Sequence, residues 1–333
     1  MAFWETNPRR KRTSGRCQHE PQARTPARTQ SYAGAEAGSA RVESGTNLAG
    51  SGGSTRCARN WFGSAVFPLA AVRKLTLSLG QMTPVLGDPK ANFECVRAWT
   101  AEAALRGSQL ILFPELWSTG GDLPHWEQHA AVLGAGMFAA MAELALEFRI
   151  ALGGSILERR DGRAYNTFAM YGNTGEQLGV YRKLHLFQLM DEHKWLAAGD
   201  APAMLGAEWG QSGLAICYDL RFGELFRGYA LAGAELALLP ALWPAVRRAH
   251  WSTLLRARAI ENQMFMAAVN CAGRVGNTEF GGASAVVDPW GEVLVEGGAA
   301  PELLTTEIDL DLVREVRAKI PVFADRRPDA YRL

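Results

Sequence analysis

From Lys74 onward, short apolar runs alternate with longer stretches of helical apolar periodicity. This alternation is typical of layered α/β folds, in which helices separate short strands. Helices are expected at 88–107, where Asp88-Pro89 supplies a cap and a first-turn proline, and at 137–148 and 250–263, which are the clearest. Strands are expected at 75–82, 109–114, 150–157, 167–171, 214–218, 236–240, 264–270, 283–288 and 292–296. The sequence therefore predicts a mixed α/β domain with many strands.

Residues 1–72 lack this alternation. They are rich in Arg, Ser, Gly and Ala and poor in branched aliphatic residues, so they cannot bury enough apolar surface to fold alone. Their Arg-rich character resembles an organellar transit peptide, but four Glu residues weaken that interpretation. We expect a disordered or spurious extension over 1–72, one domain over 73–325 and a C-terminal tail over 326–333.

Charge and cysteine content narrow the class of protein. The net charge is +1, and the first 60 residues hold ten Arg or Lys, so the remainder is mildly acidic and predicts no nucleic-acid partner. Charged residues interrupt every apolar stretch, which predicts no membrane span. The five cysteines form no C-x-x-C pair, which favours reduced thiols in the cytoplasm. We expect no metal.

Glu115 ends the apolar segment that begins at Ile111. Strand ends are where α/β enzymes place catalytic groups. An apolar wall disfavours the charged form of a carboxylate, which suits it to act as a general base. A solvated glutamate at the end of a strand would look the same, so this segment alone assigns no role.

Lys183 lies in the segment Tyr181–Phe187, where basic and apolar residues alternate. If the segment is a strand, Lys183 and His185 share a face. A lysine directed into a pocket can stabilise the negative oxygen that develops during acyl transfer. A surface lysine is the alternative.

Cys217 follows the apolar run Gly213–Ile216, ahead of a helix expected at 224–233. A nucleophile at such a turn is exposed, and a helix N-terminus lowers the pKa of a thiol from about 8.5. A small buried core cysteine is the alternative.

The order Glu115, Lys183 and Cys217, with successive members 68 and 34 positions apart, resembles the nitrilase (carbon-nitrogen hydrolase) superfamily. The resemblance runs from about Lys74 to about Ala324. It implies a four-layer αββα sandwich, subunits that pair as a homodimer, and no metal or organic cofactor.

Carried over by position, the resemblance implies that Glu115 is the general base and Cys217 the nucleophile. Lys183 and the backbone N–H of Tyr218 would form the oxyanion site. The family also has a further Glu between the Lys and Cys segments, and Glu192 is its best match here. Asp191 is adjacent to it, which leaves that assignment open. The implied reaction passes through a thioester and releases ammonia.

Within the superfamily, Trp243–Trp251, Ala257–Gln263 and Leu312–Phe323 resemble the omega-amidase branch. That branch hydrolyses the terminal amide of 2-oxo acids such as 2-oxoglutaramate and 2-oxosuccinamate. The resemblance therefore implies a small-molecule amide as substrate.

Such a substrate carries a carboxylate, for which a bidentate arginine is the natural partner. We expect Arg247 to bind it, with Trp243 and Phe187 beside it; a structural arginine is the alternative for Arg247. Arg221 is expected to form an internal ion pair with a residue such as Asp219 or Glu224.

Other functions stay open. The chain could be a deaminated-glutathione amidase, an N-carbamoyl amino acid hydrolase or a true nitrilase. Asn270–Cys271 stands where relatives often carry Asn–Arg, which puts the choice of substrate in question. A non-catalytic binding protein with this fold would usually lack one of the three catalytic residues. A Cys/His protease is weakly supported, because only His250 lies downstream of Cys217.

Overall fold

The computed structural model describes residues 73–331. The extension expected at 1–72 lies outside the described residues, as do the last two residues of the expected C-terminal tail. The domain boundaries drawn from the sequence stay predictions.

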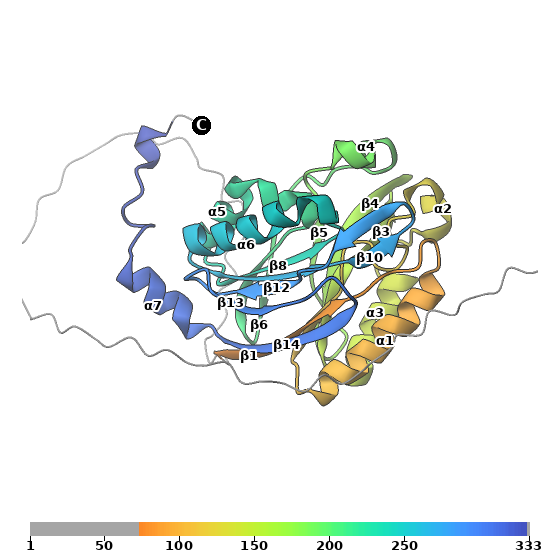
Figure 1. Ribbon diagram of the computed structural model, residues 1–333, viewed down its shortest axis with the longest axis horizontal. Helices are drawn as coiled ribbons and strands as arrows, with labels where there is room; N and C mark the ends of the chain where they lie inside the picture. Colours follow the sequence, from red (N-terminus) through yellow and green to blue (C-terminus); the bar gives the residue numbers. More distant parts are fainter. Residues whose placement is uncertain (1–72, 332–333) are drawn as a thin grey trace, which may run out of the picture. The chain divides into compact units, whose positions relative to one another are not determined.

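Two six-stranded sheets form the centre of the structure (Figure 1). In order across the first sheet, the strands are β14 (Glu302–Asp309), β1 (Lys74–Gln81), β2 (Leu110–Leu112), β3 (Ala151–Arg160), β4 (Arg163–Tyr171) and β5 (Gln177–Arg182). In order across the second, they are β13 (Val293–Glu296), β12 (Ala285–Val287), β9 (Phe265–Asn270), β8 (Leu236–Ala241), β7 (Gly210–Leu214) and β6 (Ala203–Ala207). A ribbon of β10 (Ala272–Val275) and β11 (Thr278–Gly281) adjoins them.

Helices cover the outer face of each sheet (Figure 1). The helices α1 (Pro89–Leu105) and α3 (Met137–Phe148) lie on the first sheet, and α5 (Gly223–Leu231) and α6 (Arg248–Asn262) lie on the second. The sheets face each other, because β1 contacts β9 and β5 contacts β6. The layers are therefore helix, sheet, sheet and helix, which confirms the expected αββα sandwich.

Parallel strands occupy the middle of both sheets. The strands β1, β2 and β3 run parallel in the first sheet, and β7, β8 and β9 run parallel in the second. Every residue of β8 and β9 is buried, as expected for strands covered on both faces. The segments that follow the carboxyl ends of such strands are where α/β proteins place functional groups.

Local signals set several helix boundaries. The side chain of Asp88 accepts a hydrogen bond from the backbone N–H of Ala91 at 3.0 Å, and Pro89 occupies the first turn of α1. Helix α3 spans the residues expected from its apolar periodicity.

Two expected strands end earlier than the sequence suggested. Strand β5 ends at Arg182, so Lys183 lies in the loop that follows. Strand β7 ends at Leu214, and a 3₁₀ turn, η3 (Cys217–Arg221), begins at Cys217. After β7 the apolar run continues past the last ladder hydrogen bond because Ala215 and Ile216 are buried as well. After β5, Lys183 is buried, whereas Leu184 to Phe187 are only partly buried.

Other elements were not expected from the sequence. They are β6, β10, β11 and β14, the helices α2 (Trp126–His129), α4 (Glu192–Trp195) and α7 (Asp311–Lys319), and the 3₁₀ turns η1 (Leu123–His125), η2 (Gln188–Met190), η4 (Ala245–Arg247) and η5 (Pro328–Ala330). Strand β14 illustrates why such elements were not predicted. Its buried and exposed residues alternate only weakly, and the strand is defined by antiparallel pairing with β1, which lies more than 200 residues earlier in the chain.

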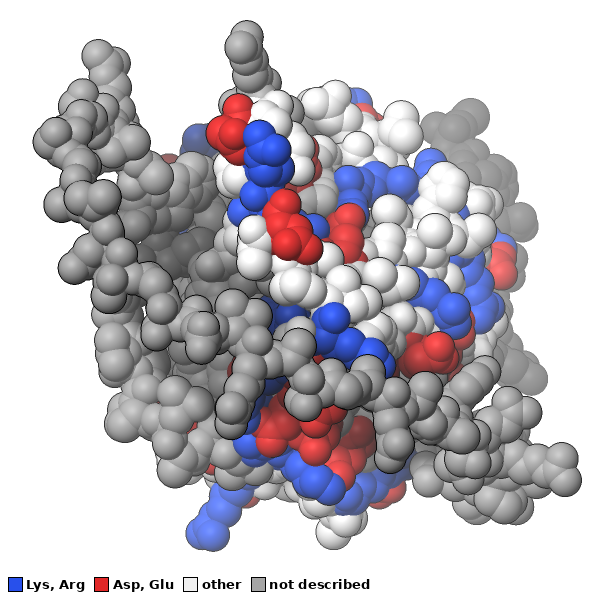
Figure 2. Space-filling model, turned by 90° about the vertical axis from the view of Figure 1, so that its left-hand side faces the viewer, with Lys and Arg blue, Asp and Glu red and all other residues white. Residues whose placement is uncertain are grey.

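The surface carries charges of both signs. On the face shown in Figure 2, the visible Lys and Arg side chains are interspersed with Asp and Glu. None of the helices in residues 73–331 is long and apolar enough to cross a membrane.

Candidate active site

Glu115 and Cys217 each follow a parallel strand, and the backbone at or next to each of them has a positive φ. Glu115 lies three residues after the end of β2, and Cys217 lies three residues after the end of β7. The next residue after Glu115, Leu116, has a φ of 46°, and Cys217 itself has a φ of 47°. Side chains other than glycine rarely adopt these values, and such strain concentrates at functional sites where surrounding contacts hold it.

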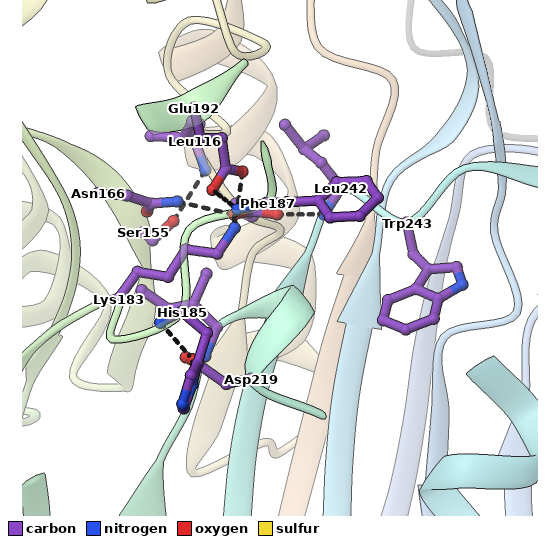
Figure 3. A network of polar contacts seen from close by, with 12 residues as sticks. Leu116, Ser155, Asn166, Lys183, His185, Phe187, Glu192, Asp219, Leu242 and Trp243 are labelled. Carbon is purple, nitrogen blue, oxygen red and sulfur yellow. Dashed lines mark hydrogen bonds and ion pairs between the residues drawn. The ribbon is translucent and has the colours of Figure 1, made fainter. Parts of the chain in front are cut away.

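Lys183 joins two carboxylates in the interior (Figure 3). Its Nζ lies 2.7 Å from Oε1 of Glu115 and 2.7 Å from Oε1 of Glu192. The three residues are only 1%, 1% and 7% exposed, respectively. An ammonium group has three N–H donors, so two are used here and one is left for another acceptor.

Further donors fix the two carboxylates. The Nδ2 of Asn166 donates to Oε1 of Glu115, and the backbone N–H of Leu242 donates to Oε2, both at 2.7 Å. The backbone N–H of Phe187 donates to Oε2 of Glu192 at 2.8 Å. Each carboxylate is therefore held at both oxygens.

Charge coupling shifts the pKa values of this cluster. Burial by itself would lower the pKa of Lys183, but the carboxylates of Glu115 and Glu192 outweigh it and raise that pKa well above its usual value. Burial raises the pKa of Glu192, and Lys183 opposes this effect. Lys183 is therefore a permanent positive charge at neutral pH.

The thiol of Cys217 behaves differently from the expectation. Burial raises its pKa well above the usual value, and Glu115 raises it further, whereas Lys183 lowers it. The sequence-based expectation of an exposed thiol with a lowered pKa is wrong, because Cys217 is 6% exposed and begins a short 3₁₀ turn instead of a long helix. Burial and the nearby Glu115 therefore both disfavour the thiolate form of Cys217.

A small pocket opens beside Cys217. It is lined by Phe187, Cys217, Tyr218, Arg221, Leu242, Trp243, Pro244 and Arg247. It holds about 230 Å³ of space, open solvent at its mouth included. The lining therefore combines one thiol, two guanidinium groups and three aromatic rings.

Arg221 faces this pocket instead of an acidic partner. Its guanidinium lies 4.8 Å from the centre of the Trp243 ring, and its NH2 group lies 3.3 Å from Nδ1 of His250. The expected ion pair with Asp219 or Glu224 is therefore wrong. Asp219 is instead satisfied by other donors, because it is fully buried and receives hydrogen bonds from Tyr181 and His185.

The three residues expected near the substrate all line this pocket. Arg247 lies with its guanidinium 5.4 Å from the centre of the Phe187 ring. The indole Nε1 of Trp243 donates to the backbone oxygen of Arg247 at 2.8 Å, which ties the two together. Lys183, Glu115 and Glu192 lie in the adjoining buried cluster, and Cys217 belongs to the wall of the pocket.

Comparison with known families agrees with this arrangement. Residues 76–318 match the model of the carbon-nitrogen hydrolase family. The chain belongs to the carbon-nitrogen hydrolase family. It is therefore a hydrolase of the class that acts on amides.

Individual relatives of this carbon-nitrogen hydrolase cover most of the described chain. It is 39% identical to 2-oxoglutaramate amidase of Bacillus subtilis (strain 168), over 78% of this chain and 100% of the relative. It is 36% identical to omega-amidase NIT2 of Homo sapiens, over 69% of this chain and 87% of the relative. Its fold is similar to that of XC1258 from Xanthomonas campestris, a CN-hydrolase superfamily protein with an arsenic adduct in the active site, with a TM-score of 0.73 and 30% identity over 78% of this chain and 99% of the other.

Sequence reasoning missed several residues that support the site of this carbon-nitrogen hydrolase. Asn166 bonds Glu115, and the Oγ of Ser155 accepts from the backbone N–H of Leu116 at 2.9 Å. Asn270 accepts from the backbone N–H of Trp243 at 2.7 Å and so holds the wall of the pocket. A polar residue within an apolar strand, as at each of these positions, is the signal that could have found them.

One pair of histidines has the H-x-x-x-H spacing that metal ligands on a helix often have, and the sequence analysis did not detect it. His125 and His129 are four residues apart, and both contact Asp122, at 2.8 Å and 3.3 Å. Within residues 73–331, no group of three or more His, Cys, Asp or Glu is arranged to hold a metal ion. The histidines instead bond the carboxylate that precedes η1.

Proposed function

We propose that this enzyme hydrolyses the terminal amide of a small 2-oxo acid, such as 2-oxoglutaramate or 2-oxosuccinamate, to the dicarboxylate and ammonia. The observation that carries the proposal is the buried cluster of Lys183 with Glu115 and Glu192, set beside Cys217 in a pocket that two guanidinium groups line. The names of the relatives, 2-oxoglutaramate amidase and omega-amidase, support the same substrate class.

The first half of the reaction forms a thioester. Glu115 takes the proton of Cys217 as the sulfur attacks the amide carbon, which suits a thiol whose pKa burial has raised. The remaining N–H of Lys183 and the backbone N–H of Tyr218 stabilise the negative oxygen of the tetrahedral intermediate. Glu115 then gives the proton to the leaving nitrogen, the carbon–nitrogen bond breaks, and ammonia leaves.

The second half consumes water. Glu115 takes a proton from a water molecule, which attacks the thioester carbon, and the carbon–sulfur bond breaks as the proton returns to the sulfur of Cys217. Glu192 holds Lys183 in place through both halves and contributes to positioning the water. The carboxylic acid leaves and the enzyme returns to its starting state.

The substrate's carboxylate is bound at the pocket by arginine. Arg221 and Arg247 both line the pocket, and aromatic rings support each guanidinium. Planar guanidinium groups match the geometry of a carboxylate. Arg221 binds the carboxylate together with Arg247. It is available to do so because no carboxylate among residues 73–331 forms an ion pair with Arg221.

Two other readings are weaker. Sister amidases and nitrilases would use the same three catalytic residues, but a simple neutral nitrile would give the two arginines no partner. A non-catalytic binding protein would not need a thiol, a lysine and two carboxylates brought together in the interior. Burial of such a cluster is costly, which favours a catalytic use.

The proposal includes a homodimer in the cytoplasm. A groove between α6 and the strands β12 and β13, lined by residues such as Leu255, Val287 and Val293, offers a surface on which a second copy could pack. A reducing compartment keeps a nucleophilic thiol active. Sedimentation of the purified chain tests the dimer, which a monomer at working concentration would contradict.

Ammonia release from 2-oxoglutaramate tests the substrate. The assay runs beside a panel of glutamine, carbamoyl amino acids, deaminated glutathione and simple nitriles, with Cys217→Ala as the control. Fast turnover of 2-oxoglutaramate that Cys217→Ala abolishes supports the proposal. Faster turnover of another panel member moves the enzyme to a sister branch, and no turnover of any favours the non-catalytic reading.

A further inference from the structure

Asp219 is a fully buried carboxylate two residues after Cys217. Its Oδ2 accepts from the hydroxyl of Tyr181 at 2.7 Å and from the backbone N–H of Ile216 at 2.9 Å. Its Oδ1 accepts from the backbone N–H and from Nδ1 of His185, at 3.1 Å and 2.7 Å. A buried carboxylate requires such donors, and here they come from two separate parts of the chain.

One side of this carboxylate holds the turn that carries the nucleophile. The bond from Ile216 to Oδ2 closes the turn across Cys217, and the backbone N–H of Asp219 returns a bond to the oxygen of Ile216 at 3.0 Å. Cys217 has left-handed backbone within this turn. Such backbone persists only where the surroundings hold it, and Asp219 is the side chain that does so.

The other side of the carboxylate holds the loop that carries the oxyanion group. His185 lies two residues after Lys183, and the same loop continues to Phe187, whose backbone N–H binds Glu192. Figure 3 shows His185 and Asp219 in contact just below Lys183. The ring of His185 also stacks on Phe222, with 3.6 Å between ring centres, which fixes its plane.

A cap for the turn would need only the bond from Ile216 to Oδ2, yet Oδ2 also accepts from Tyr181 and Oδ1 accepts twice from His185. The carboxylate of Asp219 is therefore bonded to both catalytic segments. We propose that Asp219 and His185 form a positioning pair that sets the distance between the nitrogen of Lys183 and the sulfur of Cys217. In this pair the carboxylate oxygen is the acceptor and Nδ1 of His185 is the donor. The inference rests on the proposed roles of Cys217 and Lys183.

Substitution of His185 tests the pair without removing the buried carboxylate. His185→Leu removes the side-chain donor at similar size, whereas His185→Asn keeps an N–H donor close to the position of Nδ1. His193→Leu is the matched control, because His193 is an exposed histidine on α4. Thermal unfolding of all three variants shows whether they are folded.

The expected result is a change in kcat. In the ammonia assay with 2-oxoglutaramate, His185→Leu lowers kcat by about 100-fold, because a small displacement of reacting groups costs about that much. KM changes less than about threefold, and His185→Asn restores most of the rate. A purely structural role would instead lower stability and leave the Asn and Leu variants equally active per folded molecule, which would overturn the proposal.

A second readout does not depend on the substrate. The rate at which iodoacetamide alkylates Cys217 reports the placement of its thiol between Glu115 and Lys183, even if 2-oxoglutaramate proves to be the wrong amide. We expect this rate to change at least about tenfold in His185→Leu and to recover in His185→Asn. Unchanged alkylation in a folded His185→Leu variant overturns the positioning role, whereas failure of the wild type on 2-oxoglutaramate overturns only the substrate assignment.

Discussion

Lys183 and Glu115 form a buried ion pair 2.7 Å long between residues 68 positions apart in the sequence. The side chains of both residues are almost completely excluded from solvent. Breaking one side of such a pair leaves an uncompensated charge in the interior, which costs more than the pair contributes.

Replacing Lys183 with Met should therefore destabilise the fold and abolish turnover. The expected loss in the free energy of unfolding is about 3 kcal/mol at neutral pH. Burial raises the pKa of Glu192 and Lys183 opposes this, so that pKa rises further in the variant. A group whose pKa is raised in the folded state destabilises the fold as pH rises through that value, so the deficit should narrow when pH falls from about 8 to about 5. Urea unfolding at both pH values measures it, and an equal deficit at both would contradict the assignment.

The pKa of Cys217 should move in opposite directions in two variants. Glu115→Gln removes a negative charge that disfavours the thiolate, so the pKa should fall, whereas Lys183→Met removes a favourable charge and should raise it. Titration of the ultraviolet absorbance of the thiolate measures both, with Cys217→Ala subtracting the other thiols. Glu115→Gln should still lose at least about 100-fold in turnover, because the base is gone. A thiol pKa that rises in Glu115→Gln would contradict this electrostatic account.

Arg221 and Arg247 should bind the negatively charged carboxylate of the substrate. Replacing either with Gln should raise KM for 2-oxoglutaramate by about 10- to 100-fold, the worth of a hydrogen bond to a charged group. KM for a short neutral amide should change less than about threefold. Arg163→Gln is the control, because Arg163 is exposed at the start of β4 and lines neither the pocket nor the groove. Equal losses on charged and neutral amides would show that the two arginines have a structural role.

Two substitutions that introduce or remove glycine test the cost of left-handed backbone (positive φ) independently of activity. Arg149 ends α3 with a φ of 51° and an exposed side chain, so Arg149→Gly should stabilise the fold by about 1 kcal/mol. Gly107 has a φ of 76° and open space where a Cβ would lie, so Gly107→Ala should destabilise it by about as much. Thermal unfolding measures both, and shifts of the same sign would contradict the reasoning.

Local sequence determined much of this protein. The Asp88 cap, the first-turn Pro89 and the apolar periodicity of α3 act within a few residues, so they predict helices without knowledge of the rest of the chain. The apolar runs that end near Glu115 and Cys217 likewise place catalytic candidates after strands. The order of Glu115, Lys183 and Cys217 carried the family resemblance, which the family match confirms.

Only the tertiary structure decided the state of the site. The pKa of Cys217 depends on burial and on Glu115, about 100 residues away, so a local helix argument gave the wrong direction. Asp219 is not available to Arg221, because His185 and Tyr181 already donate hydrogen bonds to it, and Arg221 lies at the pocket instead. Strand β14 forms because its backbone pairs with β1 at the edge of the first sheet. Charge and pairing act through space between segments distant in sequence, whereas helix caps and periodicity act along the chain.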